Sequence, residues 1–351
     1  MVSQMRREIG EQPEALQRTL DALLPQREEV RRLAEGRGRV LFVARGSSDN
    51  AAIYGRYLLE AWAGVNAGLA APSIATHYRT RLDLSDALVV AVSQSGRTAE
   101  IVESQAWARE CGATTVAVTN DGDSPLATGA DLALVTQAGP EIAVPATKSY
   151  LGQLAAMAVV GTALAPEPTA LDAELARSPE VVARLVDTPV PDAALELLDA
   201  AEDLVVSGRG LMLGTALETA LKLEETCLQP VRGYSYADLR HGPISVVDTD
   251  VVALLLAAPD GPMTGPMTEL ADDLRGRGAR VVGLGGDPAF AAAVDVAVPG
   301  PDLSEPLAPL GAIVPSQLLV EAFARRLGLD PDNPRGLSKV TQTDPDSGPQ
   351  G

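Results

Sequence analysis

Small hydroxyl side chains follow a buried apolar run in the first half of the chain. The run ALVVAV is followed at once by SQSGRT, which supplies Ser93, Ser95 and Thr98. Hydroxyl groups, a glycine that lets the backbone approach a ligand and the amide groups of a following helix together favour a phosphate monoester. A second run, RVLFV, leads into RGSSDN, so Ser47 and Ser48 could reach the same ligand. The pattern predicts a phosphate site, with helix capping by serine and threonine as the alternative.

Other phosphate and metal motifs are absent from the sequence. It contains no G-x-x-x-x-G-K-[ST] stretch, and GRGLMLG has one residue too many for the dinucleotide pattern G-x-G-x-x-G. Only two histidines occur, His77 and His241, so no metal-ligand cluster is indicated. We therefore expect neither a nucleotide nor a metal cofactor.

Charged side chains on one predicted helix could move protons. The segment TALETALKLEET places Glu218, Lys222 and Glu225 at spacings of four and three residues, so the three share a face. Such spacing usually means an exposed ladder of ion pairs. The apolar neighbours favour instead a partly shielded carboxylate beside a lysine, which can be tuned to exchange protons with carbon.

Two further residues are candidates from their local sequence. His241 lies in a polar loop, YADLRHGPISVV, where a catalytic and a structural role are both open. His77 has no comparable support, and we interpret it as structural. Lys339 lies between Leu337 and Val340 in NPRGLSKVTQT, and these apolar neighbours could anchor the segment in a groove.

The elements that must position these residues repeat along the chain as strand, loop and helix. Unbroken runs of Val, Ala and Leu alternate with helical segments, which indicates an α/β fold with parallel sheets covered on both faces. Arg45 and Arg209 each stand in an Arg-Gly pair 15 positions before a helical glutamate, and later features repeat at a similar offset of about 165 residues. This internal correspondence predicts a duplication.

The chain length of 351 residues also favours two domains. The Pro-rich stretch APEPTALDAELARSPEVV and the helix after it form the natural linker. We predict an N-terminal helical segment at 1–37, a first α/β domain at 38–166, a helical linker at 167–197, a second α/β domain at 198–330 and a C-terminal tail at 331–351.

Composition limits the partners and the location that we expect. Lys plus Arg is 28 and Asp plus Glu is 47, for a net charge of −19, so neither nucleic acid nor an anionic membrane surface is an expected partner. The N-terminus lacks the apolar core of a signal peptide, and the apolar run at 154–165 is too short to span a bilayer. Two cysteines are too few for a disulfide framework, which predicts a reducing, cytoplasmic location.

Six motifs in this order resemble the double sugar-isomerase-domain proteins: RGSSDN, SQSGRT, AVPATKSYL, ALKLEE, RHGP and PRGLSKVTQT. That family includes the isomerase half of glucosamine-6-phosphate synthase and a group of glucosamine-6-phosphate deaminases. The resemblance extends from about residue 5 to residue 343. It implies two tandem sugar-isomerase domains, each a flavodoxin-like three-layer sandwich.

The resemblance also implies a role for each candidate. Glu225 would move a proton between C1 and C2 of the open-chain sugar, and Lys222 would stabilise charge beside it. His241 would open the sugar ring, reaching into the site of the partner subunit in a homodimer. Lys339 of the tail would close over the sugar near its reactive end. The implied phosphate and sugar contacts are Ser47, Ser48, Ser93, Gln94, Ser95, Thr98, Val144 and Ala146.

Two departures from the synthase pattern bear on the expected reaction. The chain has neither a glutaminase domain nor an N-terminal cysteine nucleophile, so we expect that it does not draw ammonia from glutamine. Arg97 and Ala146 stand where the synthase pattern has an acidic residue and a serine, and SQSGR and PATKSYL look closer to the deaminase branch.

The resemblance therefore favours a phosphorylated amino sugar as substrate. The expected reaction converts glucosamine 6-phosphate and water to fructose 6-phosphate and ammonium, by steps that need no metal or redox cofactor. The alternatives are a deaminase, deglycase or ammonia-dependent isomerase for another amino-sugar phosphate, or a sugar-phosphate sensor without catalysis.

Overall fold

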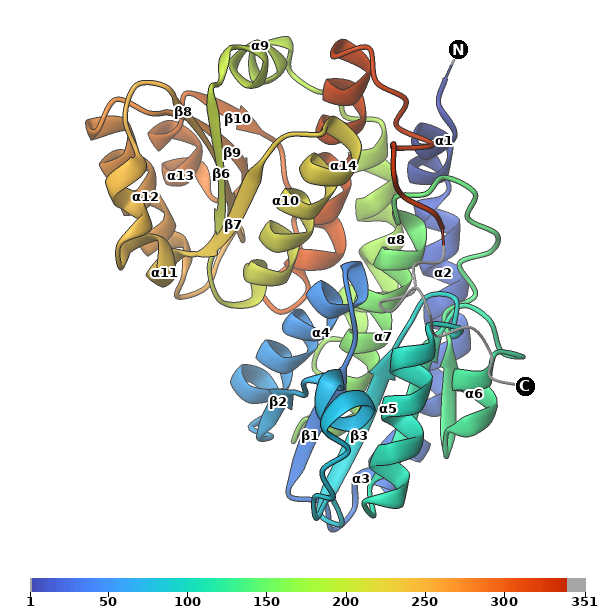
Figure 1. The fold of residues 1–351 in the computed structure, drawn as a ribbon. Helices are drawn as coiled ribbons and strands as arrows, with labels where there is room; N and C mark the ends of the chain where they lie inside the picture. The colour runs from blue at the N-terminus through green and yellow to red at the C-terminus, as the bar shows by residue number, and fades with distance from the viewer. Residues whose placement is uncertain (1, 340–351) are drawn as a thin grey trace. The chain divides into compact units, whose positions relative to one another are not determined.

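The computed structural model describes residues 2–339, which form two compact units (Figure 1). The first-sheet unit consists of Ala15–Glu141, Lys148–Asp172 and, among the described residues, 338 and 339. The second-sheet unit consists of residues 2–14, Ile142–Thr147 and Ala173–Leu337. Each unit contains one sheet, and the two are described separately.

The first-sheet unit is built on five parallel strands in the order β2-β1-β3-β4-β5. The central strand β3 is buried along all six of its residues, as predicted for a strand that is covered on both faces. The strands are β1 (Arg39–Val43), β2 (Ala67–Leu69), β3 (Ala87–Val92), β4 (Thr114–Thr119) and β5 (Leu132–Val135).

The second-sheet unit repeats this arrangement. Its five parallel strands follow the order β7-β6-β8-β9-β10, which is the order of the first sheet when the strands of each sheet are numbered along the chain. The predicted α/β fold with two parallel, helix-flanked sheets is therefore confirmed. The strands are β6 (Asp203–Gly208), β7 (Val231–Ser235), β8 (Val251–Ala257), β9 (Arg280–Gly285) and β10 (Val296–Val298).

Helices cover both faces of the first sheet. Alternate residues of β3 point to opposite faces, so Ala87, Val89 and Ala91 join a core with Ile101 and Ala108 of α5. The helix that begins within RGSSDN starts at Ser47 and ends in one turn of π-helix. The helices are α2 (Gln12–Leu23), α3 (Arg27–Ala34), α4 (Ser47–Leu58), the π-turns Leu59–Ala63 and Ile74–Tyr78, α5 (Ala99–Glu110), α6 (Pro125–Gly129) and α7 (Lys148–Leu164).

In the second-sheet unit, the face of the sheet that carries Ala253 and Leu255 of β8 packs against α12 and α13. The helix α10 packs against α14 and also contacts β6 and β7. The helices are α1 (Gln4–Gly10), α8 (Asp172–Val186), α9 (Asp192–Ala200), α10 (Leu213–Cys227), α11 (Tyr236–Arg240), α12 (Thr264–Gly276), α13 (Pro288–Ala293) and α14 (Ala308–Arg326). Within residues 2–339, no helix combines the length and the apolar character that a membrane span requires.

Two glycines let α4 and α7 approach each other closely. A Cβ atom at Gly55 of α4 would lie 2.6 Å from the sulfur of Met157, and one at Gly161 of α7 would lie 2.5 Å from Cδ2 of Leu58. Both neighbours are fully buried, so they have little room to move away. The helix pair that covers one face of the first sheet therefore depends on residues without side chains.

The substitution Gly161→Ala should destabilise the protein by about 1–3 kcal/mol, because the added methyl group overpacks a closed interface. The free energy of unfolding in urea measures this effect. The matched control is Gly276→Ala, at the exposed end of α12, where a Cβ meets nothing within 4 Å. The control should be neutral or stabilising by about 1 kcal/mol or less, and an equal loss in both variants would contradict the packing argument.

Candidate functional site

The hydroxyl loop, residues 93–98, joins the end of β3 to α5 and is held by its backbone. The amide of Ser93 donates to Val118 O at 3.0 Å, and Gln94 O accepts from the amide of Asn120 at 3.0 Å. Further along, Gly96 O accepts from the amide of Leu126 at 3.1 Å. The shape of the loop is thus fixed by main-chain bonds to β4, to the residue after it and to α6.

Gly96 is required by the shape of this loop. Its φ of +62° lies in the left-handed region, where a side chain is strained. A Cβ atom at this position would lie 2.1 Å from Oγ of Ser124. No other residue type fits here without moving the loop.

Helix capping does not account for the hydroxyls. Thr98 is the N-cap residue of α5, yet its side chain makes no capping hydrogen bond, and its Oγ1 lies 3.4 Å from Oγ of Ser93. The N-cap of α4 is Gly46, so Ser47 and Ser48 lie inside the first turn of that helix. Because β1 and β3 are neighbouring parallel strands, both hydroxyl-bearing loops leave the same edge of the sheet.

An ion pair that the sequence analysis did not identify joins these two loops. Arg45 donates from Nη2 to Oε1 of Glu100 at 2.9 Å and from Nε to Oε2 at 3.0 Å. The Glu100 side chain is 6% exposed. This two-point contact holds the start of α5 against the loop after β1, and no local sequence pattern reveals it because the partners are 55 residues apart.

In the second-sheet unit, the loop after β8 is lined by carboxylates instead. Gly210 and Gly261 again have positive φ values, +61° and +91°, after β6 and β8. A Cβ at Gly261 would lie 2.4 Å from Oε2 of Glu305, so this carboxylate lies directly against the loop. Burial raises the pKa of Glu305, with Asp260 as the second cause. A phosphate is therefore disfavoured there, and the first-sheet unit carries the candidate anion site.

The charged residues of α10 do not form an exposed ladder. The side chains of Glu218 and Lys222 are 0% and 2% exposed, whereas Glu225 is 24% exposed. The Lys222 ammonium lies 3.4 Å from Oε1 of Glu218 and donates a hydrogen bond to Oε2 of Glu225. Burial alone would lower the pKa of Lys222, but the two carboxylates outweigh it and raise this pKa, so Lys222 is an ammonium at neutral pH.

Three other predicted residues also belong to the second-sheet unit. His241 is exposed and follows α11, where its amide donates to Ala237 O at 3.1 Å. Val144 and Ala146 lie in the segment Ile142–Thr147, which Val144 fixes by donating its amide to Asp332 O at 2.9 Å. His77, which we interpreted as structural, is exposed in the π-turn of the first-sheet unit and bonds to Thr76.

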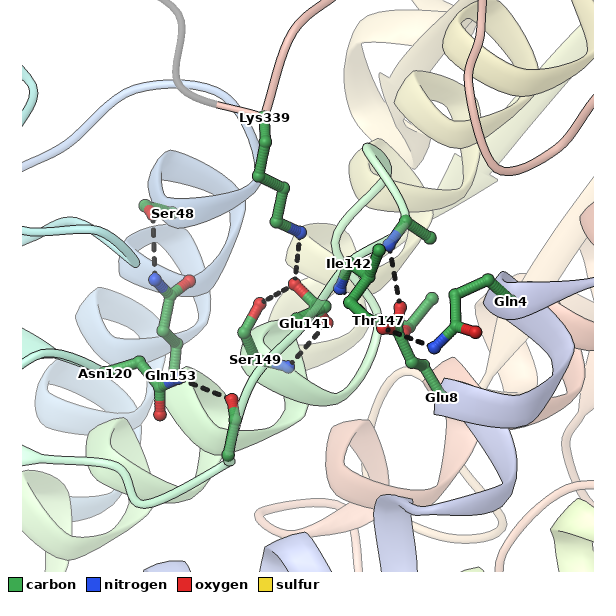
Figure 2. A network of polar contacts seen from close by, with 12 residues as sticks. Gln4, Glu8, Ser48, Asn120, Glu141, Ile142, Thr147, Ser149, Gln153 and Lys339 are labelled. Carbon is green, nitrogen blue, oxygen red and sulfur yellow. Dashed lines mark hydrogen bonds and ion pairs between the residues drawn. The ribbon is translucent and has the colours of Figure 1, made fainter.

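Lys339 contacts a buried carboxylate that the sequence analysis also missed. Its Nζ donates to Oε2 of Glu141 at 2.6 Å (Figure 2). The amide and Oγ of Ser149, in the first turn of α7, donate to the same carboxylate at 3.0 and 2.5 Å. Burial would raise the pKa of Glu141, but the Lys339 charge and these hydrogen bonds outweigh it, so the pKa lies below its usual value.

The predicted residues thus fall into two groups by unit. Sequence reasoning also missed Gln153 of α7, whose Nε2 donates to Oγ of Ser48 at 2.9 Å (Figure 2). The first-sheet unit holds Ser47, Ser48, Ser93, Gln94, Ser95, Thr98 and Lys339; the second-sheet unit holds Val144, Ala146, Lys222, Glu225 and His241.

Comparison with known proteins identifies close relatives of this arrangement. The model of the SIS domain family matches residues 33–163. Glutamine–fructose-6-phosphate aminotransferase [isomerizing] from Thermococcus kodakarensis is 35% identical over 353 residues, which cover 95% of this chain and 57% of that protein. The chain thus spans little more than half the length of the curated relative.

Two solved structures match over their whole length. The "putative phosphosugar isomerase" from Silicibacter pomeroyi DSS-3 is 35% identical with a TM-score of 0.86, covering 94% of this chain and 100% of that chain. Glucosamine-6-phosphate deaminase from Thermotoga maritima is 25% identical with a TM-score of 0.71, covering 97% of this chain and 100% of that chain.

The substitution Lys222→Met should destabilise the protein by about 3–5 kcal/mol, because it leaves the carboxylate of Glu218 buried beside an apolar side chain. Urea unfolding measures the loss. The double variant Glu218→Leu/Lys222→Met has neither the buried carboxylate nor the buried ammonium, so much of the stability should return. A double variant no more stable than Lys222→Met would contradict this electrostatic account.

Stability at acid pH should depend on Glu141. Its pKa is lowered on folding, so its charge stabilises the protein above the unfolded value of 4.5, and this contribution is lost as the pH falls through the lower folded value. We expect the difference in unfolding free energy between the wild type and Glu141→Gln to shrink below pH 4.5. Urea unfolding curves between pH 7 and pH 3 measure it; a difference that is constant with pH would be the contrary result.

Proposed function

The chain belongs to the SIS domain family, and from this premise we propose that it deaminates and isomerises a phosphorylated amino sugar. The proposed substrate is glucosamine 6-phosphate, which with water gives fructose 6-phosphate and ammonium. The hydroxyl loop would bind the phosphate, and Glu225 would transfer the proton. The proposed assembly is a homodimer in which His241 serves the partner subunit's sugar.

The environment of Glu225 is the observation that carries this proposal. Of the three charged residues on the inner face of α10, Glu225 alone keeps a quarter of its side chain accessible, and its oxygen accepts from a buried ammonium. A base must reach the substrate, whereas Lys222 can supply a fixed positive charge from within the protein. An exposed surface pair would offer neither shielding nor a fixed geometry.

The reaction balances with the groups that this chain provides. Opening of the pyranose ring requires proton transfer between the ring oxygen and the C1 hydroxyl, a role that we assign to His241. Glu225 then removes the proton from C2 of the open-chain aldehyde and returns it to C1, while a proton passes from the amino nitrogen to O1, which gives the 2-imine of fructose 6-phosphate. Water adds to the imine carbon, and the C2–N bond breaks to release ammonium.

The phosphate assignment rests on donors with a fixed geometry. Ser93, Ser95 and Thr98 offer hydroxyls around a loop that Gly96 allows to turn sharply, beside the N-terminus of the twelve-residue helix α5. The protein's net charge of −19 makes such local donors necessary for an anionic substrate. The relatives that this chain resembles, a glutamine–fructose-6-phosphate aminotransferase and a glucosamine-6-phosphate deaminase, support the same class of substrate.

Incubation with glucosamine 6-phosphate tests the proposal directly, with ammonium and fructose 6-phosphate measured in separate assays. We expect the two products in equal amounts. Turnover of galactosamine 6-phosphate but not of glucosamine 6-phosphate would reject this substrate. Binding of the sugar phosphate without either product would favour the sensor alternative.

The substitution Glu225→Gln should lower kcat by about 10²–10⁴-fold, the range for loss of a positioned general base. Its affinity for glucosamine 6-phosphate, measured by calorimetry, should change little. Glu224→Gln is the matched control, because Glu224 is the neighbouring, exposed carboxylate of the same helix and should be dispensable for turnover. Equal activity of the two variants would remove Glu225 from the mechanism.

A further inference from the structure

A buried carboxylate holds the last lysine of the chain. The Glu141 side chain is 0% exposed and the Lys339 side chain is 25% exposed, with 2.6 Å between their charged atoms. Glu141 is itself fixed from the other side by the amide and hydroxyl of Ser149 in α7. The ammonium of Lys339 therefore has a rigid partner, 198 residues away in the sequence, within the first-sheet unit.

The electrostatics make this contact hard to break. A carboxylate that is charged at neutral pH and removed from water needs a nearby cation, because water cannot replace it. The two Ser149 donors satisfy part of the hydrogen-bonding capacity of Glu141 but add no positive charge. Lys339 supplies positive charge at this carboxylate, at 2.6 Å.

The use of lysine in this chain gives independent support. Of its 28 lysines and arginines, only three are lysines: Lys148, Lys222 and Lys339. Two of them are buried, at 3% and 1% exposure, and Lys339 is paired with a buried carboxylate. All other cationic side chains of the chain are arginine, and a lysine offers a compact charge at a single point where arginine offers a broad guanidinium.

We propose that Glu141 is a positioning residue, which fixes the ammonium of Lys339. Glu141 does not itself touch the sugar in this proposal; it acts through Lys339. The kinetic part of the proposal rests on the proposed function, in which Lys339 closes over the sugar. The placement of Lys339 does not rest on it.

The first test reads this placement without any substrate. The protease Lys-C cuts only after lysine, so cleavage at Lys339 requires its side chain to leave Glu141, while cleavage at Lys148 or Lys222 reports unfolding. We expect native Glu141→Gln to release residues 340–351 about tenfold faster than the wild type or more, because proteolysis follows the population of the open form. Mass spectrometry measures the release.

Glu103→Gln is the matched control, since Glu103 is a half-exposed carboxylate on α5 of the same unit. It should be cut at the wild-type rate. Equal rates for all three proteins would overturn the proposal. If Glu141→Gln does not fold, the wild-type protein alone can test the proposal. Its native form should be cut at Lys339 at least about tenfold more slowly than a free peptide of residues 333–351. Equal cleavage of protein and peptide would be decisive against it.

The second test is a double-mutant cycle on kcat/KM for glucosamine 6-phosphate. Glu141→Gln and Lys339→Met should each lower it by about tenfold or more, and the double variant should match Lys339→Met alone. Losses that multiply would show that Glu141 acts otherwise and would overturn its positioning role. A wild type without turnover would refute the proposed function, while the protease rates would still decide where Lys339 is held.

Discussion

Parallel pairing of β1 with β3 is the constraint on which the candidate phosphate site depends. The register joins Arg39 to Ala87 and Val43 to Ala91, so both strands end at the same level of the sheet. The loops that follow must therefore leave one edge together, although their serines are more than 40 residues apart in the sequence. The ion pair between Arg45 and Glu100 then connects the two loops. Arg45 precedes Gly46 in the loop after β1, and Glu100 lies in the first turn of α5, the helix that follows the hydroxyl loop.

Buried charge is the second organising feature, and it is arranged around lysine. Lys222 and Lys339 each meet a carboxylate that is removed from water, but the two pairs differ in what surrounds them. Lys222 is enclosed and has a second carboxylate, Glu225, that reaches the surface. Lys339 is part of a terminal segment and is the more exposed partner. One arrangement can serve proton transfer, while the other can hold the ammonium of Lys339 in place.

The two sheets show how a duplicated unit diverges without changing its fold. Both units keep the strand order and the positive-φ glycines at the strand ends, because these set the path of the backbone. The side chains around the glycines differ: hydroxyls in the first-sheet unit, and Asp260 with Glu305 in the second. A shared backbone thus presents hydroxyl groups in one copy and carboxylates in the other.

Much of the fold could be predicted from the chain alone. Continuous apolar strands that alternate with helices predicted parallel, covered sheets, and the spaced Arg-Gly pairs predicted the repeat. These signals are local, or periodic along the chain, so composition and spacing carry them. The hydroxyl loop and the α10 triad were recognised for the same reason, since each lies within a dozen residues. The roles assigned to them stay predictions.

Burial and long-range partners were decided only by the tertiary structure. Spacing placed Glu218, Lys222 and Glu225 on one face of a helix, but packing against other elements determined that two are buried and one is accessible. The ion pairs of Glu141 and Glu100 carry no local signal, because the cations that they meet lie 198 and 55 residues away. A sequence specifies which groups are charged and how a helix or strand orients them; only the packed chain decides which charges lose their water, and therefore which of them must pair.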